Sequence, residues 1–339
     1  MAGTGGTNGS GGATGSGGAV GSGGAPSGGQ TGAATFPATA IFYQDISHAT
    51  VDSESMMVIA ALAASKPLQA GVGIDISMTI LKAADAVVRR PFTNQGDSPD
   101  CDTSPVPLPA GGNIEGSNNY TCKDGGDCHL LVYQGKRLYE LYQANISTGM
   151  PTGGSFTGGC LVVWDLTHDY WQPMAPPKYG RGDHCNGADA GDIPMAPLIL
   201  TADDVMSGQA THAMRFSLPN PNIRKDVYLH PATHIGGPSG DSNQPPYGTR
   251  LRLRGDYDLS KLPSDQARAV ARALQTYGMF LADGSGDNSP IFISATTDVA
   301  DVMGTRDLRG LMATDFEMVD GDQRLTWSNY QCSRTVVSD

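Results

Sequence analysis

The chain has 339 residues and a formal net charge of -12, which comes from 22 basic and 34 acidic side chains. This acidity argues against a protein whose main task is to bind nucleic acid, because contacts to phosphates need a basic surface. No apolar run approaches the ~18 residues that a membrane-spanning helix requires. We therefore expect an acidic globular protein without a membrane span.

Residues 1–34 are rich in glycine and carry neither a charge nor an aromatic ring. Such a segment buries too little apolar surface to offset the entropy of ordering it, so we expect a flexible, disordered tether before a single β-rich domain at 35–339. The segment also lacks the basic and apolar regions of a signal peptide. Tethers of this kind are typical of exported proteins. The expected location is extracellular or at the cell-envelope surface, with the export signal absent from this chain.

Short runs of β-branched and aromatic residues alternate along the rest of the chain with clusters of Gly, Pro, Asn and Asp. This pattern is typical of a sandwich or a barrel. The predicted strands are 39–43, 73–80, 129–133, 137–142, 160–166, 210–218, 225–229, 249–254, 279–281, 291–294 and 316–319. A turn at 133–136 makes the third and fourth of these a β-hairpin.

Helices are predicted at 52–65, 264–277 and 307–312, and the second has Ser264 as its N-cap and Gly278 as its stop. Strands and helices do not alternate regularly, which disfavours a doubly wound parallel sheet. The predicted fold is mainly β, a jelly-roll-type β-sandwich with a few peripheral helices.

The chain contains six cysteines, Cys101, Cys122, Cys128, Cys160, Cys185 and Cys332. An even number in a chain that is expected to be exported predicts disulfides. We expect at least two, with Cys160–Cys185 as one and Cys122 bonded to Cys101 or Cys128 as the other.

Several stretches, in the order GRGDHCNGADAGDIPMAPLIL, ATHAMRFSLPN, PPYGTRLRLR and ALQTYGMFLADGSG, resemble a group of exported, largely uncharacterised proteins of soil bacteria. The stretches HLLVYQGKRLYELYQA and GGCLVVWDL resemble the same group. Its members often occur beside carbohydrate-binding modules, which implies work on a polysaccharide. The resemblance supplies no catalytic residues, so these must be argued from chemistry.

Three carboxylates are candidates for catalysis: Glu140, Asp165 and Asp189. A carboxylate on an apolar strand face must be paired, hydrogen-bonded or part of a cleft. Glycoside hydrolysis needs two carboxylates about 5–10 Å apart across such a cleft. Because the hairpin and strand 160–166 follow each other closely, Glu140 and Asp165 are expected to face one groove. The leading hypothesis is an extracellular glycoside hydrolase, and the competing interpretation is that these carboxylates are solvated or salt-bridged.

A second enzymatic hypothesis uses histidine and arginine. Lyases that act on acidic glycans neutralise the uronate with arginines and remove a proton with a base. Here His212 and His234 are the candidate bases, and Arg215 and Arg250 the candidate ligands of the anionic sugar. In the alternating segment 249–254, the other interpretation is a salt-bridged outer sheet face.

Trp164 and Tyr142 are further candidates for substrate binding. If the protein is a non-catalytic glycan-binding or adhesion module, aromatic platforms at Trp164, Tyr170, Trp171 and Trp327 would stack on sugars. No cofactor is expected to be required. A structural Ca²⁺ in the acidic loops 97–102 and 124–127 and a His-bound metal are minor alternatives. We expect a monomer with a polysaccharide partner.

Overall fold

The structure is a computed structural model, and it describes residues 35–96, 100–122, 126–146, 155–171, 180–321, 323–328, 332, 334 and 336–337. The predicted tether at 1–34 lies outside these residues, as do parts of both acidic loops. Among the described residues, no helix is long and apolar enough to cross a membrane.

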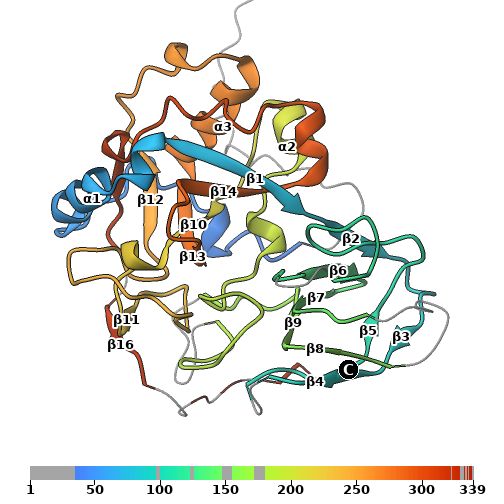
Figure 1. Cartoon of the computed structure of the whole chain (residues 1–339). Helices are drawn as coiled ribbons and strands as arrows, with labels where there is room; N and C mark the ends of the chain where they lie inside the picture. Colours follow the sequence, from blue (N-terminus) through green and yellow to red (C-terminus); the bar gives the residue numbers. More distant parts are fainter. Residues whose placement is uncertain are drawn as a thin grey trace, which may run out of the picture. The chain divides into compact units, whose positions relative to one another are not determined.

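The larger sheet has six strands in the order β1-β14-β10-β13-β12-β15 (Figure 1). Their bounds are β1 (Val72–Met78), β14 (Ile291–Thr296), β10 (Met214–Pro219), β13 (Met279–Ser285), β12 (Arg250–Leu253) and β15 (Phe316–Met318). The pairs β1–β14 and β10–β13 are parallel, and the other pairs are antiparallel. Parallel neighbours are possible here because long crossovers connect them. A jelly-roll topology is therefore not confirmed, although the fold is mainly β.

The smaller main sheet has the order β2-β6-β7-β9. Its strands are β2 (Ile80–Ala83), β6 (Leu130–Gln134), β7 (Arg137–Tyr142) and β9 (Cys160–Asp165). The predicted hairpin is confirmed, because β6 and β7 are antiparallel neighbours. Only one residue separates β1 from β2, so a single stretch of chain belongs to both sheets, as Figure 1 shows.

The remaining strands form three two-stranded pairs. These are β3 (Arg89–Arg90) with β5 (Val106–Pro107), β4 (Phe92–Asn94) with β8 (Phe156–Gly158), and β11 (Val227–Tyr228) with β16 (Leu325–Thr326). The α-helices among the described residues are α1 (Ser55–Ala64), α2 (Ala202–Ser207) and α3 (Asp265–Thr276).

Two of these helices confirm predicted ones. Helix α3 begins after Ser264, whose side chain accepts a hydrogen bond from the amide of Ala267 at 3.1 Å, as the N-cap prediction requires. Helix α1 lies inside the predicted 52–65. Helix α2 was not predicted because it spans only six residues, too few for a periodic pattern.

Two predicted elements are wrong. The predicted strand 39–43 contains a 3-10 helix at Ile41–Tyr43, because alternation over five residues does not distinguish a strand from a tight turn. The predicted helix 307–312 is a series of turns in which Gly310 interrupts a segment too short to be helical alone.

Three disulfides join all six cysteines: Cys101–Cys160, Cys122–Cys128 and Cys185–Cys332. The prediction of at least two is confirmed, and so is the pairing of Cys122 with Cys128. Disulfides of this number indicate an oxidising compartment.

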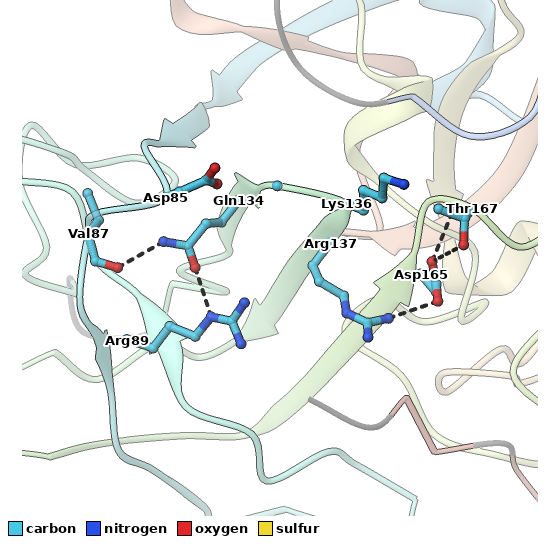
Figure 2. Close-up of a pocket in the computed structure, with 9 residues that line it drawn as sticks. Asp85, Val87, Arg89, Gln134, Lys136, Arg137, Asp165 and Thr167 are labelled. Atoms are coloured by element: carbon cyan, nitrogen blue, oxygen red, sulfur yellow. Dashed lines mark hydrogen bonds and ion pairs between the residues drawn. The ribbon is translucent and has the colours of Figure 1, made fainter.

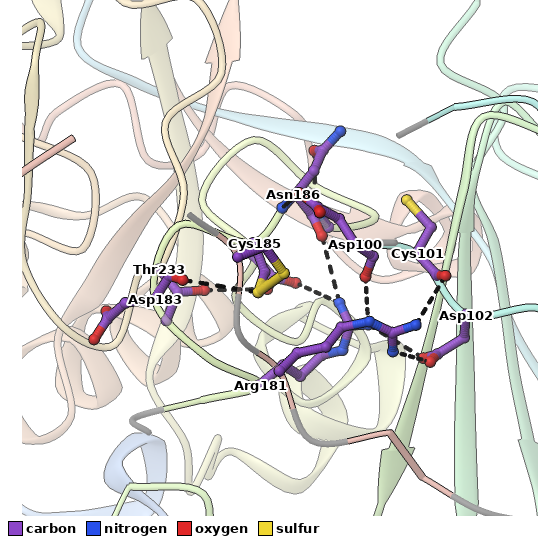
Figure 3. Close-up of a disulfide and its surroundings, with 12 residues drawn as sticks. Asp100, Cys101, Asp102, Arg181, Asp183, Cys185, Asn186 and Thr233 are labelled. Carbon is purple, nitrogen blue, oxygen red and sulfur yellow. Dashed lines mark hydrogen bonds and ion pairs between the residues drawn. A yellow bond between two sulfur atoms is a disulfide. The ribbon is translucent and has the colours of Figure 1, made fainter. Parts of the chain in front are cut away.

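The predicted Cys160–Cys185 bond is wrong, because Cys160 is bonded to Cys101 and Cys185 to Cys332. The loops that carry Cys101 and Cys185 do lie side by side, but a buried arginine joins them (Figure 3). Nη2 of Arg181 donates to the carbonyl of Asp100 at 3.0 Å and to Asp102 at 3.2 Å. Cys185 is bonded to Cys332, which is 147 residues away, and local spacing does not indicate this pairing.

Candidate functional site

A row of polar side chains crosses one face of the larger sheet. Asp75 on β1 is the register partner of Ser294 on β14. Ser294 Oγ accepts a hydrogen bond from Nη1 of Arg215 on β10 at 3.0 Å. Nη2 of the same arginine donates to Asp283 on β13 at 2.9 Å. The row therefore joins four neighbouring strands, and Arg215 is its centre.

A β-bulge on β13 sets the place of Asp283. Phe216 pairs with Leu281, but the next residue, Ser217, pairs with Asp283, which leaves Ala282 as the extra residue. Bulges of this kind redirect side chains and often lie near active sites. The carbonyl of Ala282 accepts a hydrogen bond from the amide of Gly191 at 2.9 Å. The bulge thus anchors the loop that carries Asp189.

Asp189 and Asp283 share one guanidinium nitrogen. Nη2 of Arg215 lies 3.0 Å from Asp189 Oδ2 and 2.9 Å from Asp283 Oδ2. The side chains of Arg215 and Asp189 are 2% and 1% exposed, whereas that of Asp283 is 25% exposed. The positive charge of Arg215 is therefore compensated inside the protein, and only Asp283 of the three opens to solvent.

The environments of Asp189 and Arg215 perturb their pKa values. Burial raises the pKa of Asp189, Arg215 opposes this rise, and repulsion from Asp283 adds to it. Burial lowers the pKa of Arg215, but the charges of Asp189 and Asp283 outweigh this and raise it. The arginine is consequently always cationic. Strongly perturbed carboxylates that border a cavity are candidates for a functional site.

A cavity of about 490 Å³ opens in front of this cluster. Its ionisable lining residues are Asp127, Asp189, Asp283, His129, His234 and Tyr142. Glycines form part of the remaining wall and bring the backbone close to the space. The volume is in the range of sites that bind small molecules or single sugar rings.

His129, in the cavity wall, forms a buried ion pair with Glu115. Nδ1 of His129 lies 2.7 Å from Glu115 Oε2, and Nε2 lies 3.0 Å from the carbonyl of Ala188. Both ring nitrogens face acceptors, so only the doubly protonated ring satisfies both. Burial opposes this charge, but Glu115 raises the pKa of His129 to about 9. In return, His129 lowers the pKa of Glu115 to about 2 against the effect of burial.

Asp127 lies at the cavity wall near the same imidazolium. Partial desolvation raises the pKa of Asp127; His129 opposes this, and the charges of Asp283 and Glu115 add to it. Desolvation also raises the pKa of Tyr142, with contributions from Asp127 and Asp283. Because His129 and Tyr142 each interact with both aspartates, the two carboxylates border the same space.

The cavity brings together some of the residues that the sequence predicts and not others. Asp189, His234 and Tyr142 line it, and Arg215 lies directly behind it. Nδ1 of His234 is 2.9 Å from the carbonyl of Ala190, which orients the ring beside the Asp189 loop.

Glu140 and Asp165 do not face one groove, and this prediction is wrong. In the β7–β9 register Glu140 pairs with Val162, and Arg137 pairs with Asp165. The two positions are three residues apart along each strand, and side chains alternate between the faces, so the two carboxylates point to opposite faces of the sheet.

Glu140 is buried and holds the core together. It accepts hydrogen bonds from Nε1 of Trp164 at 2.9 Å and from the amides of Met195 and Ala196 at 2.8 Å each. Burial raises its pKa to about 7, although these three donors oppose the rise. Only 1% of the residue is exposed, so it does not reach a substrate.

Asp165 lines a different cavity, of about 790 Å³, beside the β6–β7 turn (Figure 2). Its carboxylate lies 3.0 Å from Nη1 of Arg137 and accepts two hydrogen bonds from Thr167. Partial burial raises the pKa of Asp165, but Thr167 and Arg137 outweigh this and lower it. The salt-bridged interpretation therefore fits Asp165. Lys136 and Arg89 also border this cavity, which gives it a mixed charge.

The other candidates lie in the body of the fold. His212 contacts Asp204 at 3.3 Å and the carbonyl of Ala213 at 2.8 Å. Arg250 donates to the carbonyls of three residues, Ile41, Gln44 and Tyr277. Neither residue lines the 490 Å³ cavity.

Three of the four predicted aromatic platforms are buried, and the fourth, Trp327, is partly buried. Trp164, Tyr170 and Trp171 are 1%, 4% and 6% exposed and belong to the hydrophobic core. Trp327 packs against His234, with ring centroids 4.7 Å apart. Along 249–254, the salt-bridged interpretation fits Arg252, which pairs with Glu317, and Arg254, which pairs with Asp256.

Sequence reasoning did not select Asp283, Asp127, Glu115 or His129 for catalysis. The signal for Asp283 was the segment Asp-Gly-Ser-Gly at the end of a strand, where glycines let the backbone approach a ligand. Glu115 and His129 carry no local signal, because their pairing depends on how the loop that carries Glu115 folds back onto the start of β6, where the amide of Glu115 donates to the carbonyl of His129 at 2.9 Å.

Within the described ranges, no group of three or more His, Cys, Asp or Glu side chains is arranged to hold a metal ion. The acidic loops 97–102 and 124–127 lie partly outside those ranges.

The chain matches no protein-family model, no curated protein and no solved structure. Any functional conclusion therefore depends on the chemistry of the cavity.

Proposed function

We propose that the protein is an extracellular glycoside hydrolase that cleaves a neutral polysaccharide at the cavity of Asp127 and Asp283. One observation carries the proposal. Asp283 is ion-paired to Arg215 and yet 25% exposed, and it borders the same cavity as the carboxylate of Asp127, whose pKa is raised by partial burial. Two carboxylates in unlike environments are what acid–base cleavage of a glycosidic bond requires.

The two carboxylates take different roles. Asp283, held by the hydrogen bond from Nη2 of Arg215, acts either as the nucleophile on the anomeric carbon or as the base that activates water. Asp127, whose raised pKa favours the protonated form, donates a proton to the leaving oxygen. Asp189 is a positioning residue, because it holds Arg215 from the buried side.

The charge of the cavity supports a neutral rather than an acidic substrate. Arg215 is 2% exposed, and two carboxylates already pair with it. Its positive charge is therefore not available to bind the carboxylate of a uronate. His129 is 3% exposed and paired with Glu115. The carboxylates that remain would repel an anionic sugar. These contacts disfavour the lyase alternative, and the burial of Trp164 and Trp171 disfavours a stacking module.

The location is part of the proposal. Three disulfides fit an exported protein, and the resemblance to exported proteins found beside carbohydrate-binding modules points to the same environment.

The test is a product assay on neutral polysaccharides (laminarin, xylan, galactan, galactomannan and starch) and on the anionic homogalacturonan and alginate. We expect new reducing ends from at least one neutral polymer and no absorbance of unsaturated uronates. Asp283→Asn and Asp127→Asn should each lower the rate by about 10²–10⁴-fold. Asp165→Asn, in the other cavity, is the matched control and should leave the rate unchanged. Absence of product from every neutral polymer, or full activity of Asp283→Asn, would overturn the proposal.

A further inference from the structure

Two polar residues stand beside Asp283 at the carboxyl ends of β10 and β13. The strands are parallel, and Pro219 pairs with Ser285 at their last positions. Asn220 follows directly after Pro219. Because parallel strands end at the same edge, Asn220 and Ser285 are neighbours, and both line the 490 Å³ cavity.

Both residues present a buried polar atom that the described part of the protein does not satisfy. Oδ1 of Asn220 and Oγ of Ser285 have no hydrogen-bond partner there. Buried polar atoms are nearly always hydrogen-bonded, and one without a partner destabilises the fold. A functional role is the usual reason to keep such an atom. Both residues line the 490 Å³ cavity, so these polar groups lie next to the space that a ligand would fill.

The backbone at Gly284 keeps Asn220 in this place. A Cβ at position 284 would lie 2.6 Å from Oδ1 of Asn220 and 3.3 Å from the hydroxyl of Tyr247. Any side chain at this position would push the amide away from the wall. A glycine between Asp283 and Ser285 therefore allows three functional groups to face one space.

We propose that Asn220 and Ser285 form the subsite that binds ring hydroxyl groups of the sugar held at Asp283, and so select a neutral polyhydroxylated sugar. The inference rests on the proposed hydrolase function. An amide oxygen accepts hydrogen bonds, and a serine hydroxyl both donates and accepts. Beside the carboxylate of Asp283, such groups fit a ligand that donates hydrogen bonds and carries no negative charge. Sugar hydroxyls meet both conditions.

The proposal has a signature that a purely structural role would not give. Removing an unsatisfied buried atom should not weaken the fold, so Asn220→Ala and Ser285→Ala should melt at the wild-type temperature or above it. At the same time each should lower kcat/KM on the neutral polymer that the wild type cleaves by about three- to tenfold, the value of one hydrogen bond. Ser289→Ala, four residues further along and outside the cavity lining, is the matched control and should behave as wild type. Wild-type kcat/KM in both variants, or a fall in melting temperature that accounts for the lost activity, would overturn the inference.

A binding experiment separates this inference from the hydrolase proposal. Wild-type protein and both alanine variants are run in native gels that contain the same five neutral polymers, so that binding appears as retardation without any cleavage. One outcome is that the wild type releases no product but is retarded by a polymer, and that the variants are retarded less. This would support the subsite and overturn the hydrolase proposal. If the wild type is neither active nor retarded, both fail.

Discussion

Asp189 and Asp283 come from different parts of the chain, yet both accept a hydrogen bond from the same nitrogen, Nη2 of Arg215. Asp189 is on a loop, and Asp283 is at the end of a strand. The amide of Gly191 bonds both to Asp189 and to the bulge carbonyl of Ala282, which keeps the loop on the sheet. The two carboxylates lie at 3.0 and 2.9 Å from this nitrogen, but their side chains are 1% and 25% exposed.

This difference in burial predicts different effects on stability. Breaking a buried ion pair leaves an uncompensated charge and costs about 3–5 kcal/mol, so Asp189→Asn should lower the free energy of unfolding by this amount. The Asp283→Asn change should cost about 1 kcal/mol, because solvent screens the partly exposed pair. Urea unfolding of both variants measures this. Equal losses would contradict the assignment of Asp189 as the structural partner.

The ion pair of Glu115 and His129 predicts how stability depends on pH. The pKa of His129 is raised from 6.5 to about 9, so its contribution is complete below pH 6.5 and is lost as the pH rises through 9. The pKa of Glu115 is lowered from 4.5 to about 2, so its contribution is complete above pH 4.5 and is lost as the pH falls through 2.

Urea unfolding at pH 6 and at pH 9.5 tests this window. The wild type should lose a few kcal/mol of unfolding free energy between the two. Glu115→Gln should lose much less, because the partner that raises the pKa of His129 is gone, whereas Asp165→Asn should behave as wild type. A decline of the same size in Glu115→Gln would show that another group is responsible.

Glu140 is predicted to be structural and not catalytic. In Glu140→Gln the new amide group meets either the indole N–H of Trp164 or the amides of Met195 and Ala196, and all of these are donors. One unmatched buried group costs about 1–3 kcal/mol, so the melting temperature should fall. Native protein should keep its activity per folded molecule. A rate loss without a loss of stability would restore Glu140 as a catalytic candidate.

The disulfides are predicted to contribute unequally. Cross-links stabilise a fold more when they close longer loops. Replacing Cys185 and Cys332, which are 147 residues apart, or Cys101 and Cys160, which are 59 apart, by alanine should cost about 4–5 kcal/mol. The Cys122–Cys128 pair closes a loop of only 6 residues and should cost about 2 kcal/mol. Thermal unfolding compares the three double variants, and thiol titration of the unreduced, denatured wild type should find no free cysteine.

Local sequence patterns were sufficient to predict much of the secondary structure. The β6–β7 hairpin and helix α3 lie where the sequence predicts them, because a short turn and an N-cap act between neighbouring residues. Among the site residues, Asp189 was selected because it lies in a glycine-rich loop, and the structure places it at the cavity.

The alignment of neighbouring strands, and hence which side chains share a face of the sheet, could not be predicted from the sequence. The alternation of β7 and β9 was read correctly within each strand, but the relation of Glu140 to Asp165 depends on how the two strands align. The observed register places Arg137 opposite Asp165 and so separates the two carboxylates. A shift of one residue would have reversed this, and no local pattern decides between the two registers.

By itself, the sequence determined the mainly β class, the acidic charge, the presence of disulfides and the positions of most strands. These follow from composition and from interactions a few residues long. Only the tertiary structure decided which carboxylates meet. Arg215, Asp189 and Asp283 converge because β10 and β13 are parallel neighbours and because a bulge at Ala282 binds the loop at Gly191. Those contacts join residues far apart in the chain, and their free energy comes from packing the whole sheet, which no local segment encodes.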